Sequence, residues 1–415
     1  MLRLTGGRTL GPAGIVWLLG VSQIVGYGTL YYSFAILADD MASSLGWPVS
    51  WLYGSFSLAL LGGGFLAPLI GRRVDRHGAA AVMTAGSAVA AATLLLASLA
   101  PGAIAFTAAL VVMQAAAALV LYDSAFAALV QATGSDARRR ITHLTLIAGF
   151  ASTLFWPLTS WLHSGLDWRE ILRVFAALNL FVCLPIHLVL ARGHNRQRAA
   201  VGVTETVPLP AHADAVPVAP ALRRRLLLLV TLGFALSNFA ASAMLAQLVP
   251  TLMMLGLGST ALLVSSLFGP AQVLVRFVNM LLGVERHPMA ATLVALAMTP
   301  LALLLLMATA PVTAGAIAFA VLLGFGSGLK SIVQGTLPLA LFGSAAYGAR
   351  LGIMASARQV LSAIAPFAFA ALIGGVGGRG ALGVLAAIGG LGFAALVIVA
   401  RATSAGRETP VVAGA

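Results

Sequence analysis

Long apolar runs, repeated along the whole chain, are the feature that most restricts what this sequence can fold into. Bounded by Gly, Pro or charged residues, they form twelve segments, near 13–38, 51–71, 79–100, 103–131, 141–162, 170–191, 225–250, 259–282, 289–309, 312–340, 350–374 and 380–401. A helix needs about 20 apolar residues to cross a bilayer. Only 8% of the 415 residues are charged, against about 25% in soluble domains. The chain therefore cannot form a water-facing surface, and we expect a multi-pass membrane protein.

The segments are expected to be helices, because lipid cannot satisfy an open backbone. None alternates apolar and polar residues as an outer-membrane barrel strand does. The first segment follows Arg3 and Arg8, as in a signal peptide, but exceeds the apolar core of about 7–15 residues that such a peptide has. We therefore expect a retained first helix and an all-α membrane protein with twelve transmembrane helices.

The positive charges are distributed unevenly between the hydrophilic gaps. Most of the 24 Lys and Arg residues fall in alternate gaps or tails, and only Arg169, Arg173 and Arg379 lie in or beside the opposite gaps. This bias predicts that both termini are cytoplasmic, in a cell membrane that we expect to be a bacterial inner membrane. The net charge of +13 then reflects topology, and no nucleic-acid partner is expected.

One long hydrophilic stretch divides the segments six and six. It begins and ends in arginine and is rich in proline, which indicates a flexible cytoplasmic linker. We expect an N-terminal six-helix bundle over 1–191, a linker over 192–224 and a C-terminal six-helix bundle over 225–415. The equal division is the first sign of an internal duplication.

A short pattern after the second segment repeats after the eighth. The chain reads GRRVDRHG over 71–78 and GVERHP over 283–288, in each case with a tight glycine turn expected before an acid beside arginine. With the twelve segments and the linker, the first copy resembles the signature loop of the major facilitator superfamily, matched here by Gly71, Asp75, Arg76 and Gly78. The resemblance implies two pseudo-symmetric six-helix bundles and a gating role for these four residues.

Other patterns of that superfamily are missing. Its proton-coupled drug antiporters carry an arginine in the fourth segment and a Gly-Pro motif in the fifth. Here the fourth segment has no arginine, and the fifth has Trp156-Pro157 without a Gly-Pro pair. Multidrug/proton antiport is therefore not the expected activity.

Four ionisable residues lie well inside apolar segments: Arg276, Lys330, Arg358 and Asp123. Each costs about 2.5–3.5 kcal/mol at a helix centre and usually faces a cavity or a partner. By segment position all four lie on the cytoplasmic side of their midpoints, at depths that allow one shared layer. Three cations with one acid predict an anionic substrate, and the arginine fork suits a carboxylate.

Each of these residues also has a structural interpretation. Arg358 can extend its stem to the interface, and Lys330 lies among glycines that permit close helix approach. Asp123 is either a proton carrier or a structural partner for one cation. Arg276, deep among apolar neighbours, is the residue that such explanations fit least.

A narrower resemblance is to the monocarboxylate porter and oxalate–formate exchanger branch of the superfamily. Its members carry an Asp-x-x-x-Arg pair on the eighth helix or cations on the eighth and eleventh. This chain has Gln272-x-x-x-Arg276 on the eighth and Arg358 on the eleventh. The resemblance implies anion recognition, whereas Gln272 in place of the acid argues against proton-coupled symport.

Further polar candidates lie on the first and seventh segments. Gln23, Tyr27 and Tyr31 are spaced four apart, which predicts one helix face, and Asn238 is a similar candidate on the seventh. We therefore expect substrate contacts from Arg276, Arg358, Lys330, Gln272, Tyr27, Gln23 and Asn238.

Together these patterns predict a secondary transporter that carries a small organic anion by alternating access, working as a monomer. The alternative is an efflux permease for a hydrophobic or neutral toxic compound. An enzyme is not expected, because one membrane-embedded acid gives no acid–base pair. The single cysteine, Cys183, and the histidine spacing predict no metal site, and we expect no cofactor.

Overall fold

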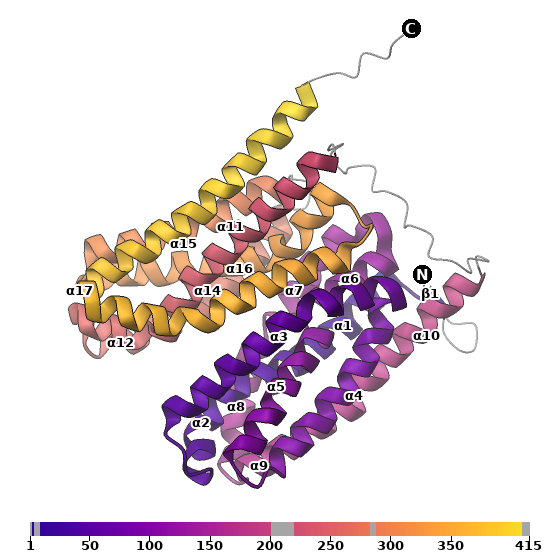
Figure 1. The fold of residues 1–415 in the computed structure, drawn as a ribbon, viewed down its shortest axis with the longest axis horizontal. Coiled ribbons are helices and arrows are strands. Elements are labelled where there is room, and N and C mark those ends of the chain that lie inside the picture. The colour runs from indigo at the N-terminus through magenta and orange to yellow at the C-terminus, as the bar shows by residue number, and fades with distance from the viewer. Residues whose placement is uncertain (1, 4–8, 201–219, 283–287, 409–415) are drawn as a thin grey trace. The chain divides into compact units, whose positions relative to one another are not determined.

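A computed structural model describes residues 2–3, 9–200, 220–282 and 288–408 (Figure 1). The elements up to residue 200 are β1 (Leu2–Arg3), β2 (Thr9–Leu10), α1 (Pro12–Tyr27), the π-turn η1 (Gly28–Tyr32), α2 (Ser33–Ser44), α3 (Val49–His77), α4 (Ala79–Ser98), α5 (Ala103–Val120), α6 (Tyr122–Thr133), the 3₁₀ turn η2 (Gly134–Asp136), α7 (Ala137–Ala148), α8 (Ala151–His163), α9 (Trp168–Leu178), the π-turn η3 (Asn179–Cys183) and α10 (Leu184–Ala200). The two short strands pair antiparallel, with Leu2 opposite Leu10.

The remaining elements are also helical. They are α11 (Pro220–Ala246), α12 (Leu248–Leu252), the π-turn η4 (Met253–Leu257), α13 (Thr260–Ser266), α14 (Phe268–Leu282), α15 (Pro288–Thr309), α16 (Thr313–Phe342) and α17 (Tyr347–Glu408). The predicted all-α fold class is confirmed by this helical architecture.

Ten helical stretches of the described residues are long and apolar enough to cross a membrane. Two of them, Ala103–His163 and Tyr347–Ser404, span 61 and 58 residues, about three times the length that one crossing needs, and each contains two of the predicted segments. In α17 the two are separated at Gly377, whose positive φ of 71° lies outside helical geometry. The remaining eight stretches correspond one to one with predicted segments.

The chain separates into two compact units. The first contains Met1–Pro210 and Ser344–Ala363, and the second contains Ala211–Gly343 and Ile364–Ala415. The beginning of α17 thus belongs with the first unit. Of the predicted linker over 192–224, α10 covers the part up to Ala200 and α11 starts at Pro220, while residues 201–219 lie outside the described residues.

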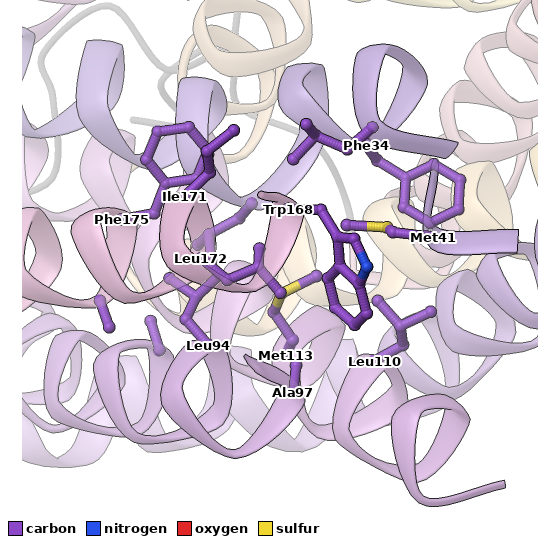
Figure 2. Close-up of a cluster of buried hydrophobic side chains, with 14 of the residues drawn as sticks. Phe34, Met41, Leu94, Ala97, Leu110, Met113, Trp168, Ile171, Leu172 and Phe175 are labelled. Carbon is purple, nitrogen blue, oxygen red and sulfur yellow. The ribbon is translucent and has the colours of Figure 1, made fainter. Parts of the chain in front are cut away.

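In the first unit α4 packs against α5, α9 and α10 (Figure 1). A buried apolar cluster fills the space between these helices and includes Met113, Trp168 and Phe175 (Figure 2). The Trp168 ring meets the Phe106 ring edge-on, with centroids 5.5 Å apart. This cluster holds α9, whose start is fixed by a capping box between Asp167 and Glu170.

In the second unit α16 packs against α14 and α15. Its glycines allow the helix backbones to approach closely: a Cβ at Gly324 would lie 2.7 Å from Phe268 O, and one at Gly328 would lie 2.6 Å from Gln272 O. Small residues at such contacts are typical of membrane helix pairs. The contact fixes the register of α14 on α16, and with it the polar groups described below.

The two units contain a matching arginine contact. Arg169 donates from Nη1 to the carbonyls of Ser98, the last residue of α4, and Ala100, just after it, each at 2.9 Å. Arg379 donates from Nη2 to the carbonyl of Ala310, just after α15, at 2.9 Å. Arg379 and Ala310 each lie 210 positions after Arg169 and Ala100. The repeated contact at the end of corresponding helices supports an internal duplication.

Candidate functional site

The predicted fourth segment, 103–131, is broken near its middle. α5 ends at Val120, Leu121 has an extended backbone with φ −81° and ψ −165°, and α6 begins at Tyr122. Gln23 Nε2 donates to the Val120 carbonyl at 2.8 Å, which satisfies a group at the end of α5. Interrupted helices in membrane proteins occur where the backbone is buried in protein or lines a cavity. The apolar sequence gave no signal of this break.

Asp123 lies in the first turn of α6, where the helix dipole favours negative charge. Arg358 Nη2 donates to both of its carboxylate oxygens, at 3.2 Å to Oδ1 and 3.0 Å to Oδ2. Arg358 is 8% exposed, and its Nη1 is buried without a hydrogen-bond partner among the described residues. A fork-to-fork pair would use two nitrogens, so the Nη1 group of this guanidinium has unmet hydrogen-bonding capacity.

Aromatic rings lie next to this ion pair. Tyr27 is close enough to interact electrostatically with both Asp123 and Arg358. Its ring centroid is 4.8 Å from that of Tyr122 and 6.1 Å from that of Tyr32. The rings therefore form a continuous contact beside the charges.

The expected common face of Gln23, Tyr27 and Tyr31 is not observed. The π-turn η1 adds one residue to the turn after Tyr27, so Tyr32 rather than Tyr31 contacts the Tyr27 ring. Tyr31 contacts Phe56 instead, at 5.9 Å between centroids. Gln23 is fully buried, with its amide on the α5 carbonyl. A substrate contact by Gln23 or Tyr27 stays a prediction.

Asp75 joins α3 to the start of α17. Its Oδ1 accepts from Gly348 N–H at 2.8 Å and its Oδ2 from Ala349 N–H at 2.7 Å. These are among the first amides of α17, which have no helical acceptor. The carboxylate therefore acts as an N-terminal cap supplied by another helix.

The expected glycine turn at Gly71 is wrong, because α3 continues through His77. Gly71 lies inside that helix, where a Cβ would overlap the Gly348 carbonyl oxygen. The turn is instead at Gly78, whose φ of 88° ends α3 and starts α4. Arg76 is exposed in the last turn of α3. The second copy of the pattern, over 283–287, lies outside the described residues.

The second unit places Arg276 in a polar row between α14 and α16. Arg276 is 6% exposed; its Nε donates to Ser331 Oγ at 3.1 Å and its Nη2 to Gln272 Oε1 at 3.4 Å. Gln272 Nε2 in turn donates to Ser327 Oγ at 3.3 Å. The row holds the guanidinium in a fixed orientation.

Lys330 lies on the same helix as Ser331 and is 5% exposed. Its Nζ donates to the carbonyl of Ser237 on α11 at 3.4 Å, beside the predicted contact residue Asn238. The sequence contains no Asp or Glu over 220–282 or 288–407.

Several site residues were not predicted from the sequence: Tyr32, Tyr122, Trp156, Ser331 and Gln131. Gln131 bonds both sides of the Gly78 turn, accepting from Ala79 N–H at 2.8 Å and donating to the Val74 carbonyl at 3.2 Å. Tyr122 and Ser331 directly neighbour Asp123 and Lys330 in the sequence, and this adjacency could have identified them as site residues. Gln131 and Trp156 carried none.

Three comparisons place this arrangement among known proteins. The sequence profile of the Major Facilitator Superfamily matches residues 16–329. A search of curated proteins finds no match in sequence. Solved structures with a similar fold include the human organic anion transporter MFSD10 (TETRAN), with a TM-score of 0.70, 15% identity and coverage of 94% of this chain and 100% of that one.

Two further solved structures are similar in fold. FucP in the outward conformation has a TM-score of 0.65 and 14% identity, covering 92% of this chain and 98% of that one. The proton:xylose symporter XylE bound to 6-bromo-6-deoxy-D-glucose has a TM-score of 0.69 and 12% identity, covering 92% and 95%. At these identities the likeness concerns the fold alone. With the profile match over most of its length and this fold, the chain belongs to the major facilitator superfamily.

Proposed function

We propose that this secondary transporter carries a small organic anion of the carboxylate type across the membrane by alternating access. The observation that carries the proposal is Arg358, whose Nη2 bonds Asp123 while its buried Nη1 has no acceptor. A buried donor without a partner costs about 1–3 kcal/mol, more when it is charged. An anion that supplies the missing acceptor recovers this cost, so the site favours a carboxylate over a neutral solute.

The charge distribution of the second unit supports the same substrate class. Arg276 and Lys330 are both buried in a stretch of sequence without carboxylates. Gln272 and Ser331 orient the Arg276 guanidinium through hydrogen bonds to Nη2 and Nε. Buried cations in membrane segments commonly mark a substrate or ion pathway. Both residues belong to the second unit, and we propose them as anion contacts of that unit by itself.

The alternative, efflux of a hydrophobic or neutral compound, is favoured by one observation. Lys330 bonds a backbone carbonyl and Arg276 bonds neutral side chains, as cations with a purely structural role also do. In that case the charges hold helices together, and the substrate contacts come from apolar and aromatic side chains. If the charges bind the substrate, their removal should abolish transport. If they only hold helices together, a folded variant without them should still transport.

The experiment is uptake into sealed proteoliposomes of a panel of labelled monocarboxylates and dicarboxylates, with uncharged amides of the same acids alongside. The test variants are Arg276→Gln and the paired Asp123→Asn/Arg358→Gln, which removes both charges of the ion pair and leaves neither behind. Arg401→Gln, on the exposed end of α17, is the matched control. We expect wild type and Arg401→Gln to carry at least one acid but not its amide, and both test variants to lose that flux.

Full carboxylate flux through both test variants would reject the anion site. Transport of the amides at the rate of the acids would favour the neutral-compound alternative. The cell-membrane location, with a bacterial inner membrane, cytoplasmic termini and action as a monomer, belongs to the same proposal. Labelling of single-cysteine variants from either side of the membrane, in a Cys183→Ser background, tests the orientation.

A further inference from the structure

We propose that the transported anion carries a flat aromatic ring beside its carboxylate, and that Tyr27, Tyr32 and Trp156 select for that ring. The inference rests on the proposed function and specifies its substrate class. It concerns only side chains of the first unit, which contains Arg358 as well as the aromatic residues.

The sequence neighbour of Asp123, the partner of Arg358, is aromatic. Tyr122 directly precedes Asp123 in the chain, and the Tyr122 ring lies 4.8 Å from the Tyr27 ring, centroid to centroid. Tyr122 in turn stacks on Phe126, with centroids 5.1 Å apart and planes inclined by 11°. An anion that binds beside the Asp123–Arg358 pair therefore has the ring contact between Tyr122 and Tyr27 in its neighbourhood.

The aromatic series continues away from the charges. The Tyr32 ring is 6.1 Å from that of Tyr27, and Trp156 of α8 meets Tyr32 edge-on at 6.2 Å and 87°. Trp156 is 52% exposed, and Tyr27 and Tyr32 are each partly exposed. The rings of this series, Tyr122, Tyr27, Tyr32 and Trp156, are thus packed on one another yet keep accessible surface.

The backbone is built to produce this series. The π-turn η1 brings Tyr32 to Tyr27, as a regular helix with 3.6 residues per turn would not. Gly28 opens the π-turn, and a Cβ there would overlap the Phe155 ring, so only glycine allows this approach to α8. π-turns often mark functional sites. This π-turn allows the ring of Tyr32 to contact the ring of Tyr27.

Aromatic rings prefer tilted, edge-on or offset contacts with other rings, with centroids about 4.5–7 Å apart. The series offers such contacts to an added ring, whereas a saturated ring of similar size gains only apolar burial. A good ring–ring contact adds about two- to tenfold in affinity. An anion with a carboxylate for Arg358 and a planar ring for Tyr27, Tyr32 and Trp156 uses both features, and a short aliphatic acid uses only the first.

The test compares benzoate with cyclohexanecarboxylate, two acids of similar size that differ in aromaticity, with acetate as the ringless acid. Each is measured as a KM for uptake by the full-length protein in proteoliposomes. The variants are Tyr27→Leu, Tyr32→Leu and Trp156→Leu; the control is Trp161→Leu, on the same helix and 70% exposed. Tyr27→Phe keeps the ring and serves if Tyr27→Leu does not fold.

We expect wild type and Trp161→Leu to take benzoate with a KM about two- to tenfold below that of cyclohexanecarboxylate. In Tyr32→Leu and Trp156→Leu this ratio should fall toward one, and in Tyr27→Phe it should persist. Equal KM values for the two acids in wild type, with both transported, would overturn the aromatic inference and leave the anion proposal standing. Transport of none of the three acids would overturn both.

Discussion

Arg358 bonds Asp123 through one nitrogen only: Nη2 reaches both carboxylate oxygens, at 3.2 and 3.0 Å, and the buried Nη1 has no hydrogen-bond partner among the described residues. The two residues lie 235 positions apart in the sequence and meet where α6 begins, after the break at Leu121. The side chains are 10% and 25% exposed, respectively. The pair is therefore partly shielded from water, and it combines a structural contact with an unfilled binding position.

Removal of one partner of this pair should destabilise the protein more than removal of both. Asp123→Asn leaves a buried guanidinium without its counter-charge, at a cost of about 3–5 kcal/mol for a fully buried pair and less for this partly exposed one. Asp123→Asn/Arg358→Gln leaves no charge behind, and we expect it to recover about half of the lost stability. The measurement is reversible unfolding in detergent for the two single variants and the double variant.

The two single variants and the double variant form a double-mutant cycle. Its matched control is a second cycle with Asp136→Asn and Arg140→Gln. Asp136 and Arg140 form an i,i+4 pair at 2.9 Å, with side chains 54% and 19% exposed, respectively, and i,i+4 helix pairs contribute about 0.3–0.5 kcal/mol. Equal interaction energies in the two cycles would mean that the Asp123–Arg358 pair behaves as a surface ion pair, contrary to its burial.

The Asp75 cap predicts a difference between two substitutions. Asp75→Ala removes both acceptors from the first amides of α17 and should cost about 0.5–2 kcal/mol. Asp75→Asn keeps one acceptor oxygen and loses the charge that favours a helix N-terminus, so we expect a smaller loss. Thermal unfolding of both variants checks this order. Identical behaviour of Asp75→Ala and wild type would show that the contact adds nothing to stability.

Close packing at Gly328 should be sensitive to a single methyl group. The added Cβ of Gly328→Ala would lie 2.6 Å from the Gln272 carbonyl oxygen, so α16 must move from α14 and carry Ser331 away from Arg276. Overpacking of this kind costs about 1–3 kcal/mol. Gly390→Ala is the control, because no atom lies within 4 Å of the added Cβ there. If both variants unfold at the same temperature, the helix contact is looser than described.

The matching arginine contacts predict unequal losses. Arg169 makes two carbonyl bonds and lies 4.3 Å from the Trp168 ring centroid, whereas Arg379 makes one carbonyl bond. Arg169→Met should therefore lower the free energy of unfolding by more than Arg379→Met, by about 1–2 kcal/mol for the extra bond and the cation–π contact. Arg173→Met, at an exposed position of α9, should have little effect. A larger loss for Arg379→Met would contradict this account.

The apolar runs predicted the helical fold because burial in lipid is a property of local composition. Each of the predicted segments overlaps a described helical stretch, and the two that share α17 are separated at Gly377. The break at Leu121 was not predicted: no Gly or Pro marks the position, and Asp123, two residues later, was interpreted as a charge inside a continuous helix. Local composition thus predicts which residues enter the membrane and not where the helix is interrupted.

The side-chain positions depended on geometry that spacing alone does not carry. Gln23, Tyr27 and Tyr31 are four apart, yet the π-turn at Gly28–Tyr32 changes the rotation after Tyr27. Gly71 was expected in a turn because glycine often ends helices, but here it allows α3 to approach Gly348. Their charge identified Asp123 and Arg358 as candidates. That they pair with each other could not be predicted, because they lie on distant segments that only the tertiary fold brings together.

The most direct measurement of the central claim is calorimetric titration of benzoate and acetate into purified wild-type protein and into Asp123→Asn/Arg358→Gln. If the unfilled side of Arg358 receives a carboxylate, wild type should bind at least one acid saturably, and the paired variant should bind it about tenfold to a hundredfold more weakly while remaining folded. Equal affinity in the two proteins, with wild type clearly binding, would contradict the account and place the anion elsewhere.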